Sequence, residues 1–209
     1  MIHDSYLESG YYHATIDAPS PKYYRTEKFF KEHDVMKVLD VGCGAGRHTY
    51  LLAEAGFDVY GFDISKKALA INKDILKKHK VGATLRQLDM KKQWPYKNNF
   101  FDAVFASRAM YQFRVADIER NIRKVKRVLK EDGYLFWEGP SYKTTRDLFL
   151  GEKMEIVEQG TWASIGGPYD GSLYHRFSSK EEVLSFLNGF KIIRFDFRGK
   201  TFSLLAKKL

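Results

Sequence analysis

The chain has 209 residues, of which 44% are hydrophobic and 15% aromatic, enough to bury one sizeable core and short for two domains. Its 35 lysines and arginines exceed its 26 acidic residues by nine, which favours an anionic partner without identifying one. The sequence has no apolar run of about eighteen residues to predict a membrane span, and its start lacks the pattern of a secretion signal. Its single cysteine, Cys43, excludes an internal disulfide, so we expect a reducing, cytoplasmic location.

The first two thirds of the chain alternate strand-like and helix-like patterns. Predicted strands cover residues 37–41, 58–62, 84–88, 101–106 and 134–138, and predicted helices cover residues 47–55, 65–80 and 115–130. The lysines and arginines of the last two helices lie opposite apolar residues at helical spacing, which favours a solvated outer face over a nucleic-acid track. Short strands alternating with helices predict a parallel sheet joined by right-handed crossovers.

The end of the chain has a different pattern. Ser178 and Ser179 precede Glu182 in a capping-box arrangement, which predicts a helix to about residue 187. Two apolar runs follow, FKIIRFDF and TFSLLAKK, separated only by residues 198–200 in a hairpin pattern. The last strand should therefore run antiparallel to the others. We predict an α/β fold with a Rossmann-like, doubly wound, seven-stranded sheet, mostly parallel with one antiparallel strand from the C-terminal hairpin.

Two segments lie outside this framework within the single domain expected over residues 1–209. Residues 1–31 contain five tyrosines, among them Tyr11 and Tyr12, and residues 140–177 are rich in Tyr, Trp and Gly. Segments of this length without periodicity are commonly lids or binding loops. We expect residues 1–31 to form an N-terminal lid, with Tyr11 and Tyr12 as substrate contacts, and residues 140–177 to form an insert near the acceptor site.

The chemistry of the chain centres on the stretch VLDVGCGAGRHT, where the first strand meets the first helix. Gly42, Gly44 and Gly46 allow positive φ and close approach of a ligand to the main chain, and the following helix end favours an anion. The dinucleotide fingerprint G-x-G-x-x-G has its last glycine, needed for tight helix packing, at the position that Arg47 occupies here. The sequence therefore fits that fingerprint poorly. The loop also lacks the lysine of a P-loop. It suits a small anionic or zwitterionic ligand.

Acidic residues end the next two strands. Asp63 follows Gly42 by 21 residues (63 − 42) and can accept hydrogen bonds from both hydroxyls of a ribose, although capping of the helix at Ser65 is an alternative. Asp89 can accept from an adenine amino group while the thioether of Met90 covers the ring, a weak signal when taken alone. Since carboxyl ends of parallel strands share one edge, the three strand ends together point to a nucleoside site.

These motifs resemble those of class I S-adenosylmethionine-dependent methyltransferases of the small-molecule type. The resemblance rests on VLDVGCGAGRHT, GFDIS, LDM, FDAVFASRAMYQF and VLKEDGYLFW, in the family's order, over residues 37–137. It implies S-adenosylmethionine as the cofactor and no metal. The cofactor-binding positions that it implies run from the methionine end through the ribose and the adenine to the sulfonium: Asp40, Gly42, Cys43, Gly44, Gly46, Asp63, Ile64, Asp89, Met90 and Ser107.

Methyl transfer from a sulfonium needs mainly alignment of the acceptor, the methyl carbon and the sulfur. A general base is required only when the acceptor arrives protonated. Candidates near the predicted site are His48 beside the glycine loop, Tyr111 after the fourth strand, which is also a candidate substrate contact, and His175 in the insert. For each of them a structural role is favoured over catalysis.

Motifs that are absent from the sequence narrow the class of methyl acceptor. The place after the fourth strand reads SRAMYQF, without the Asn/Asp-Pro-Pro-aromatic signature of nucleic-acid amino methylases, and Cys43 lies in the wrong place for a cytosine-carbon methylase. We therefore predict a small-molecule acceptor. The alternatives are an RNA or protein methylase, motivated by the excess of nine positive charges, a nicotinamide-dependent oxidoreductase, and a non-catalytic cofactor-binding protein.

Overall fold

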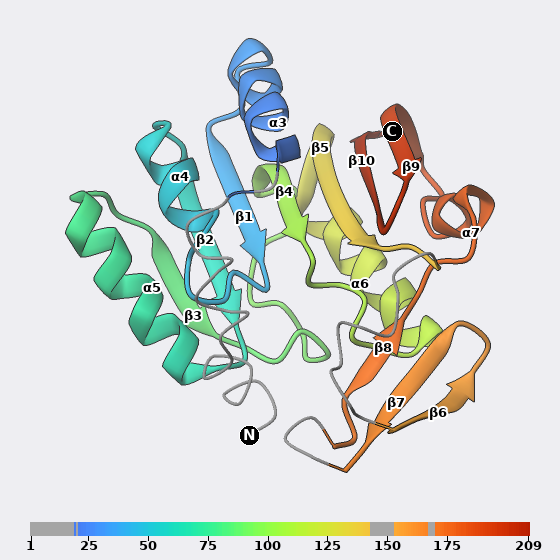
Figure 1. Cartoon of the computed structure of the whole chain (residues 1–209). Helices are drawn as coiled ribbons and strands as arrows, with labels where there is room; N and C mark the ends of the chain where they lie inside the picture. The colour runs from blue at the N-terminus through green and yellow to red at the C-terminus, as the bar shows by residue number, and fades with distance from the viewer. Residues whose placement is uncertain (1–18, 20, 143–152, 167–169) are drawn as a thin grey trace.

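The computed structural model describes residues 19, 21–142, 153–166 and 170–209, and its architecture is shown in Figure 1. Within these residues, seven strands form one sheet in the order β3-β2-β1-β4-β5-β10-β9. Their bounds are β1 Lys37–Val41, β2 Asp58–Asp63, β3 Thr84–Gln87, β4 Phe101–Ser107, β5 Leu129–Pro140, β9 Phe190–Arg198 and β10 Thr201–Lys208.

Helices cover both faces of this sheet (Figure 1). They are α3 Pro21–Glu32, α4 Thr49–Glu54, α5 Lys66–His79, α6 Val115–Val128 and α7 Lys180–Ser185. One core packs α3 and α4 against the sheet through Phe30 and Leu52. The other packs α6 and α7 through Ile122 and Val183. Because both faces are covered, β1 and β4 are almost continuously buried, as is typical of parallel strands in doubly wound sheets.

The order of the strands confirms the predicted fold class. β3, β2, β1, β4 and β5 pair in parallel. The last strand, β10, lies between β5 and β9 and runs antiparallel to both, with Leu204 opposite Trp137 and Phe195. The hairpin turns at Gly199, whose φ of +65° is favoured by a glycine.

Helix ends mostly agree with the sequence signals. Ser65 caps α5 by accepting from the Ala68 N–H (3.1 Å), and Ser179 caps α7 by accepting from the Glu182 N–H (3.2 Å). Two boundaries differ. The helix predicted from residue 47 begins at Thr49, because residues 47–48 turn with the glycine loop. β5 begins at Leu129, which pairs with Phe101 ahead of an irregularity in the strand register.

The segment expected to form a lid, residues 1–31, contains regular structure in its last third. Residues 21–32 form α3, which packs against the sheet. Tyr23 and Phe30, seven residues apart on one helical face, are 1% and 0% exposed, and they supply the apolar stripe that fixes this helix. Tyr11 and Tyr12 lie outside the described residues, so their role as substrate contacts stays a prediction.

The segment predicted as an insert contains regular structure. β6 Lys153–Glu158, β7 Thr161–Ile165 and β8 Leu173–His175 form a second, antiparallel sheet in the order β6-β7-β8. In Figure 1 this small sheet lies below the main one, toward the ends of β4 and β5. None of the helices in the described part of the chain is long and apolar enough to cross a membrane.

The inserted strand β10 should carry much of the stability of the fold. Leu204 is 1% exposed, so Leu204→Ala should lower the free energy of unfolding by about 2–5 kcal/mol through lost burial and a cavity. Ile193 on β9 is 42% exposed, and Ile193→Ala should change stability by no more than about 0.5 kcal/mol. Urea unfolding of both variants measures the difference. Similar losses in the two variants would contradict the central position of β10.

Candidate active site

The order of strands reverses between β1 and β4. From β1 the chain proceeds to β2 and β3 on one side, while β4 and β5 lie on the other side. In open parallel sheets, ligands bind at the carboxyl ends of the strands where this reversal opens a crevice. The loop after β1 and the segment after β4 form the walls here. They are close at one point, since a Cβ on Gly42 would lie 2.6 Å from the Cβ of Ala109.

The three glycines of the loop have different surroundings. Gly42 and Gly46 have no space for a side chain, because a Cβ on Gly46 would meet Asn72 Oδ1 at 2.4 Å. A Cβ on Gly44 would have no atom within 4 Å among those described. All three have positive φ, of +66°, +52° and +94° in chain order. Gly42 and Gly46 are therefore required by packing, whereas Gly44 presents bare backbone to open space.

A buried polar network holds this loop from below. The Thr49 hydroxyl donates to Asp40 Oδ2 (2.7 Å), and the Asn72 amide nitrogen lies 3.2 Å from the Thr49 oxygen and 3.3 Å from the Gly44 carbonyl oxygen. Asn72 is fully buried on α5. The sequence analysis missed it, although a polar residue at an apolar-face position between Leu69 and Leu76 was an available signal.

Asp40, one of the predicted cofactor residues, lies beneath the loop rather than on its surface. It is 3% exposed. Burial raises the pKa of its carboxyl to about 7, a shift that Asp63 adds to and that the Thr49 hydrogen bond and Arg47 oppose. Cys43 is also buried, and burial raises the pKa of its thiol. The Cys43 N–H donates to the Phe62 carbonyl (3.0 Å), so the main chain of the loop is fixed to β2.

Asp63 is placed as predicted, at the end of β2 beside the glycine loop. Its Oδ2 accepts from the Gly44 N–H (3.0 Å) and its Oδ1 from the Ser65 N–H (2.9 Å). The carboxylate thus links the loop to the start of α5, and its negative charge lies at the open side of Gly44. The neighbouring Ile64 contributes its carbonyl oxygen, which accepts from the Gln87 side chain (3.1 Å).

Asp89 and Met90 follow β3 on the same edge of the sheet. Met90 is 9% exposed, and its Cε would lie 3.5 Å from a Cβ on Gly42, so its thioether reaches the wall of the crevice. Asp89 Oδ1 accepts from the Lys91 N–H (2.8 Å). The Met90 carbonyl accepts from the Trp94 indole (3.1 Å) and from Lys124 (2.8 Å). The structure therefore brings the predicted methionine, ribose and adenine positions along one edge.

A carboxylate that the sequence analysis missed lies at the ends of β4 and β5. Ser107 ends β4 and pairs in register with Glu138 on β5. The Ser107 hydroxyl donates to Glu138 Oε2 (2.9 Å), and Lys22 Nζ of α3 lies 3.3 Å from Glu138 Oε1. Glu138 is 4% exposed. An acidic residue ending the apolar run 134–138 was its signal in the sequence.

His48 is buried between α3 and β4, away from an accessible position. Its ring stacks on Tyr23, with centroids 5.7 Å apart, and packs on Phe105 at 5.1 Å. Burial lowers the pKa of this imidazole to about 3, with help from the positive charges of Arg47 and Arg108. These contacts give His48 a packing role instead of the general-base role considered for it.

His175 is likewise held by the interior of the protein. It is 0% exposed, with Nδ1 2.8 Å from the Thr161 hydroxyl and Nε2 2.9 Å from Glu182 Oε1. The ring therefore links β7 of the small sheet, through Nδ1, to α7, through Nε2, which differs from the catalytic role considered for this residue. The His175 N–H donates to the Tyr111 carbonyl (2.7 Å), so the insert is joined by main chain to the segment after β4.

Tyr111 is partly buried, and its ring lies 6.4 Å from that of Tyr174 on β8. This position places Tyr111 between the end of β4 and the insert. Of the three candidate bases, it alone has a side chain that is not enclosed by the core. Among the described residues, no group of three or more His, Cys, Asp or Glu is arranged to hold a metal ion.

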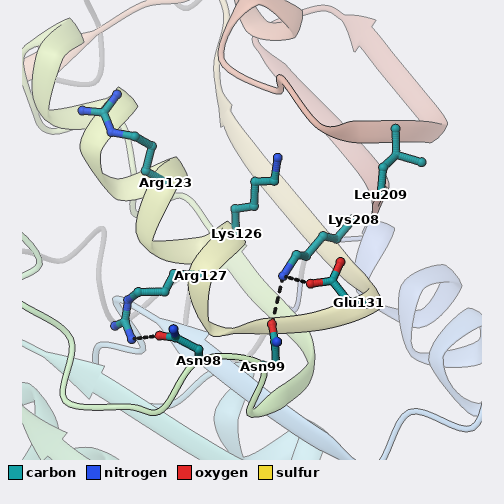
Figure 2. A pocket seen from close by; sticks show the side chains of 8 residues that line it. All are labelled: Asn98, Asn99, Arg123, Lys126, Arg127, Glu131, Lys208 and Leu209. Atoms are coloured by element: carbon teal, nitrogen blue, oxygen red, sulfur yellow. Dashed lines mark hydrogen bonds and ion pairs between the residues drawn. The ribbon is translucent and has the colours of Figure 1, made fainter.

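A separate basic cavity of about 440 Å³ lies at the opposite, amino edge of the parallel strands (Figure 2). Two of the cations that line it, Arg127 and Lys208, have structural partners. Arg127 donates to the carbonyls of Trp94 and Tyr96 and to Asn98, and Lys208 donates to Asn99 and pairs with Glu131 at 2.9 Å. This cavity is distinct from the crevice at the carboxyl edge.

The reversed strand order, the glycine loop at the reversal and the antiparallel strand inserted beside β9 define a Rossmann-like methyltransferase fold. The model of a methyltransferase domain family matches residues 32–182, well over half of the chain, and the chain belongs to that family. This match confirms the family predicted from the sequence.

Individual relatives agree with this assignment. A glycine/sarcosine N-methyltransferase of Aphanothece halophytica is 31% identical over 170 residues, which cover 79% of this chain and 64% of that protein. An uncharacterized methyltransferase of Synechocystis is 37% identical over 97 residues, 46% of this chain and 43% of that one. The curated relatives that the chain matches are thus covered over only 43–64% of their lengths. A solved S-adenosylmethionine-dependent methyltransferase from Clostridium acetobutylicum superposes with a TM-score of 0.71 at 15% identity, over 92% of this chain and 93% of that chain.

Two glycine substitutions should separate packing from ligand binding. Gly46→Ala places a methyl group against Asn72 at a φ of +94°, so it should lower the melting temperature strongly. Gly44→Ala meets no neighbour and should cost only about 1–2 kcal/mol of backbone strain, yet its methyl group would enter the crevice and abolish binding of S-adenosylhomocysteine. Thermal unfolding and calorimetry test the pair. Equal binding by Gly44→Ala and wild type would contradict the placement of the crevice.

The bonds from His175 and Ser178 to the Glu182 carboxylate, called here the Glu182 clamp, predict a loss of stability in acid. Burial raises the pKa of this carboxyl, but the bonds to His175 and Ser178 outweigh it and lower the pKa from 4.5 to about 2. A carboxyl with a depressed native pKa stabilises the fold above its ordinary pKa, and that contribution is lost as the pH falls from about 4.5 toward 2. Glu182→Gln should therefore remove this part of the pH dependence.

Urea unfolding at a series of pH values gives the measurement, with exposed Glu155→Gln on β6 as the control. The control should follow the wild-type curve throughout. A constant stability difference between Glu182→Gln and wild type from neutral pH down to about pH 2.5 would contradict the clamp.

Proposed function

We propose that this chain transfers the methyl group of S-adenosylmethionine to a small-molecule acceptor. The observation that carries the proposal is the bare backbone at Gly44, where a Cβ would have no described atom within 4 Å and the Asp63 carboxylate is fixed alongside by the Gly44 N–H (3.0 Å). Membership of the methyltransferase domain family supports the reaction class. The cofactor supplies the methyl group on a sulfonium, so the chain's own work is binding, alignment and proton removal.

The residues along the crevice fit this cofactor chemically. The backbone of residues 42–46 would bind the methionine end, because glycine lets a ligand approach the main chain. Asp63, followed by Ile64, would bind the ribose. A carboxylate has about four acceptor sites, enough for the N–H groups of Gly44 and Ser65 and for the ribose hydroxyls. Asp89 and Met90 would bind the adenine, and Ser107 would line the methyl group.

The small-molecule acceptor is supported by what surrounds the ends of β4 and β5. The insert sheet is bonded directly to the segment after β4 through His175 and Tyr111 (2.7 Å), which narrows that end of the crevice. One relative, the glycine/sarcosine N-methyltransferase, is named for small acceptors. A macromolecular acceptor, RNA or protein, is the alternative, motivated by the net charge of +9. The basic cavity at the amino edge does not favour a macromolecular acceptor, because Arg127 and Lys208 there donate to main-chain carbonyls of the protein itself.

Asp63→Ala should weaken binding of S-adenosylhomocysteine at least tenfold. The substitution removes the acceptor for the ribose hydroxyls and releases the Gly44 N–H that positions the loop, and charged hydrogen bonds of this kind contribute about 1.5–3 kcal/mol each. Asp58→Ala, at the exposed start of the same strand, is the matched control and should leave the dissociation constant unchanged. Calorimetry measures both constants. An unchanged constant for Asp63→Ala removes this residue from the site.

Two measurements test the function as a whole. Thermal shift compares S-adenosylhomocysteine with NAD, because a ligand at about 100 times its dissociation constant stabilises a protein by about 2.7 kcal/mol. Stabilisation by NAD alone would favour an oxidoreductase. Transfer of labelled methyl groups to a panel of amines, hydroxyl compounds and mixed RNA then identifies the acceptor class, and tight, strongly salt-dependent RNA methylation would favour the alternative.

A further inference from the structure

A methyltransferase whose acceptor carries a proton on its nucleophilic atom needs somewhere for that proton to go. The histidines considered for this role are engaged elsewhere. His48 is enclosed against Tyr23 and Phe105, and both ring nitrogens of His175 are bonded inside the protein. A proton acceptor for the reaction must therefore come from another group at the carboxyl edge.

The pair Ser107–Glu138 lies at that edge, beside the reversal of strand order. Ser107 is the last residue of β4, the strand adjacent to β1 and its glycine loop. Its hydroxyl donates to Glu138 Oε2 at 2.9 Å. Because a hydroxyl has a single proton, the Ser107 oxygen then offers only its lone pairs to anything else. None of the described residues donates a hydrogen bond to that oxygen, and Ser107 is partly exposed.

We propose that Ser107 contacts the methyl acceptor and that Glu138, acting through Ser107, receives the proton released by methyl transfer. The inference rests on the proposed function. As the acceptor atom bonds to the methyl carbon and the carbon–sulfur bond breaks, the proton of the acceptor passes to Ser107 Oγ. The proton of Ser107 passes to Glu138 Oε2. The sulfur leaves as a neutral thioether, and the methylated product leaves without its proton.

This geometry selects the class of acceptor. An oxygen that can only accept hydrogen bonds favours a nucleophile with an N–H or O–H, such as an amine or a hydroxyl compound. It disfavours an acceptor that is already a bare anion, because the two sets of lone pairs would face each other. Ser107 is then a specificity-determining residue as well as the contact for proton transfer.

Groups from three neighbouring elements face Glu138. From β4 and β10, its strand neighbours are the uncharged Ser107 and Ser203. From α3, the Lys22 ammonium lies 3.3 Å from Oε1 and balances the negative charge. The Arg108 main-chain N–H donates to the Glu138 carbonyl (2.9 Å), which fixes the strand end. Glu138 is thus held as a positioning residue for the Ser107 hydroxyl, with Oε1 paired to Lys22 and Oε2 directed at Ser107 of β4.

The test compares wild type with Glu138→Gln and Ser107→Ala in transfer from methyl-labelled S-adenosylmethionine to glycine, ethanolamine and catechol as protic probes, and to iodide as a proton-free probe. Both variants should lose at least about 100-fold in kcat on the protic probe that wild type uses. S-adenosylhomocysteine binding by Glu138→Gln should be unchanged, which shows that this variant folds, and a wild-type melting temperature checks the fold of Ser107→Ala. Ser107→Thr, which keeps the hydroxyl, should restore activity. Glu131→Gln, at the far edge of the sheet, is the matched carboxylate control.

The pH profile separates proton transfer from a structural role. In Glu138→Gln the residual rate should rise about tenfold per pH unit, because solvent must then remove the proton, whereas wild-type kcat should depend less steeply on pH. Glu138→Gln with wild-type kcat and an unaltered profile would overturn the inference and leave the proposed function intact. If wild type transferred methyl groups to iodide and to none of the protic probes, the inference would likewise be overturned and the proposed function left intact. No transfer to any probe would overturn the proposed small-molecule function and, with it, this inference.

Discussion

The site depends on one close approach, between the main chain of the glycine loop after β1 and the segment that follows β4. A Cβ at Gly42 would lie 2.6 Å from the Cβ of Ala109, so only a glycine lets these two strand ends remain neighbours. Because the chain leaves β1 and β4 in opposite directions along the sheet, a crevice opens just beyond that contact. The loop wall, the Asp63 carboxylate and the ends of β4 and β5 all take their positions from it.

This crevice is supported by polar groups that a simple apolar core would not contain. Asp40, Thr49 and Asn72 are buried together under the loop, and burial raises the pKa of Asp40 to about 7. Buried polar groups of this kind cost stability unless their hydrogen bonds are made. The bonds from Thr49 to Asp40 and from Asn72 to Gly44 offset part of that cost, and in return the loop is fixed before a ligand arrives.

The sequence was most informative where the physics is local. The glycine spacing, the strand ending at Asp63, the cap at Ser65 and the terminal hairpin depend on near neighbours, and the structure has them as predicted. The insert sheet and the enclosure of His175 depend on residues that meet only in the folded chain, so no pattern showed them. A histidine in a sequence has the same appearance whether it faces a crevice or a core.

Charged side chains are distributed differently at the amino and carboxyl edges of the sheet. Most of the basic excess lies on α5 and α6, with cations concentrated in their last turns, where the helix carbonyls carry partial negative charge. Arg127 satisfies three acceptors there, and Lys208 closes the start of β5. The cations at these helix ends therefore contribute to the net charge of +9 through the way the fold caps its amino edge. At the carboxyl edge the side chains are instead carboxylates and hydroxyls, among them Asp63, Ser107 and Glu138, and these are the groups to which the proposals assign the ribose and the released proton.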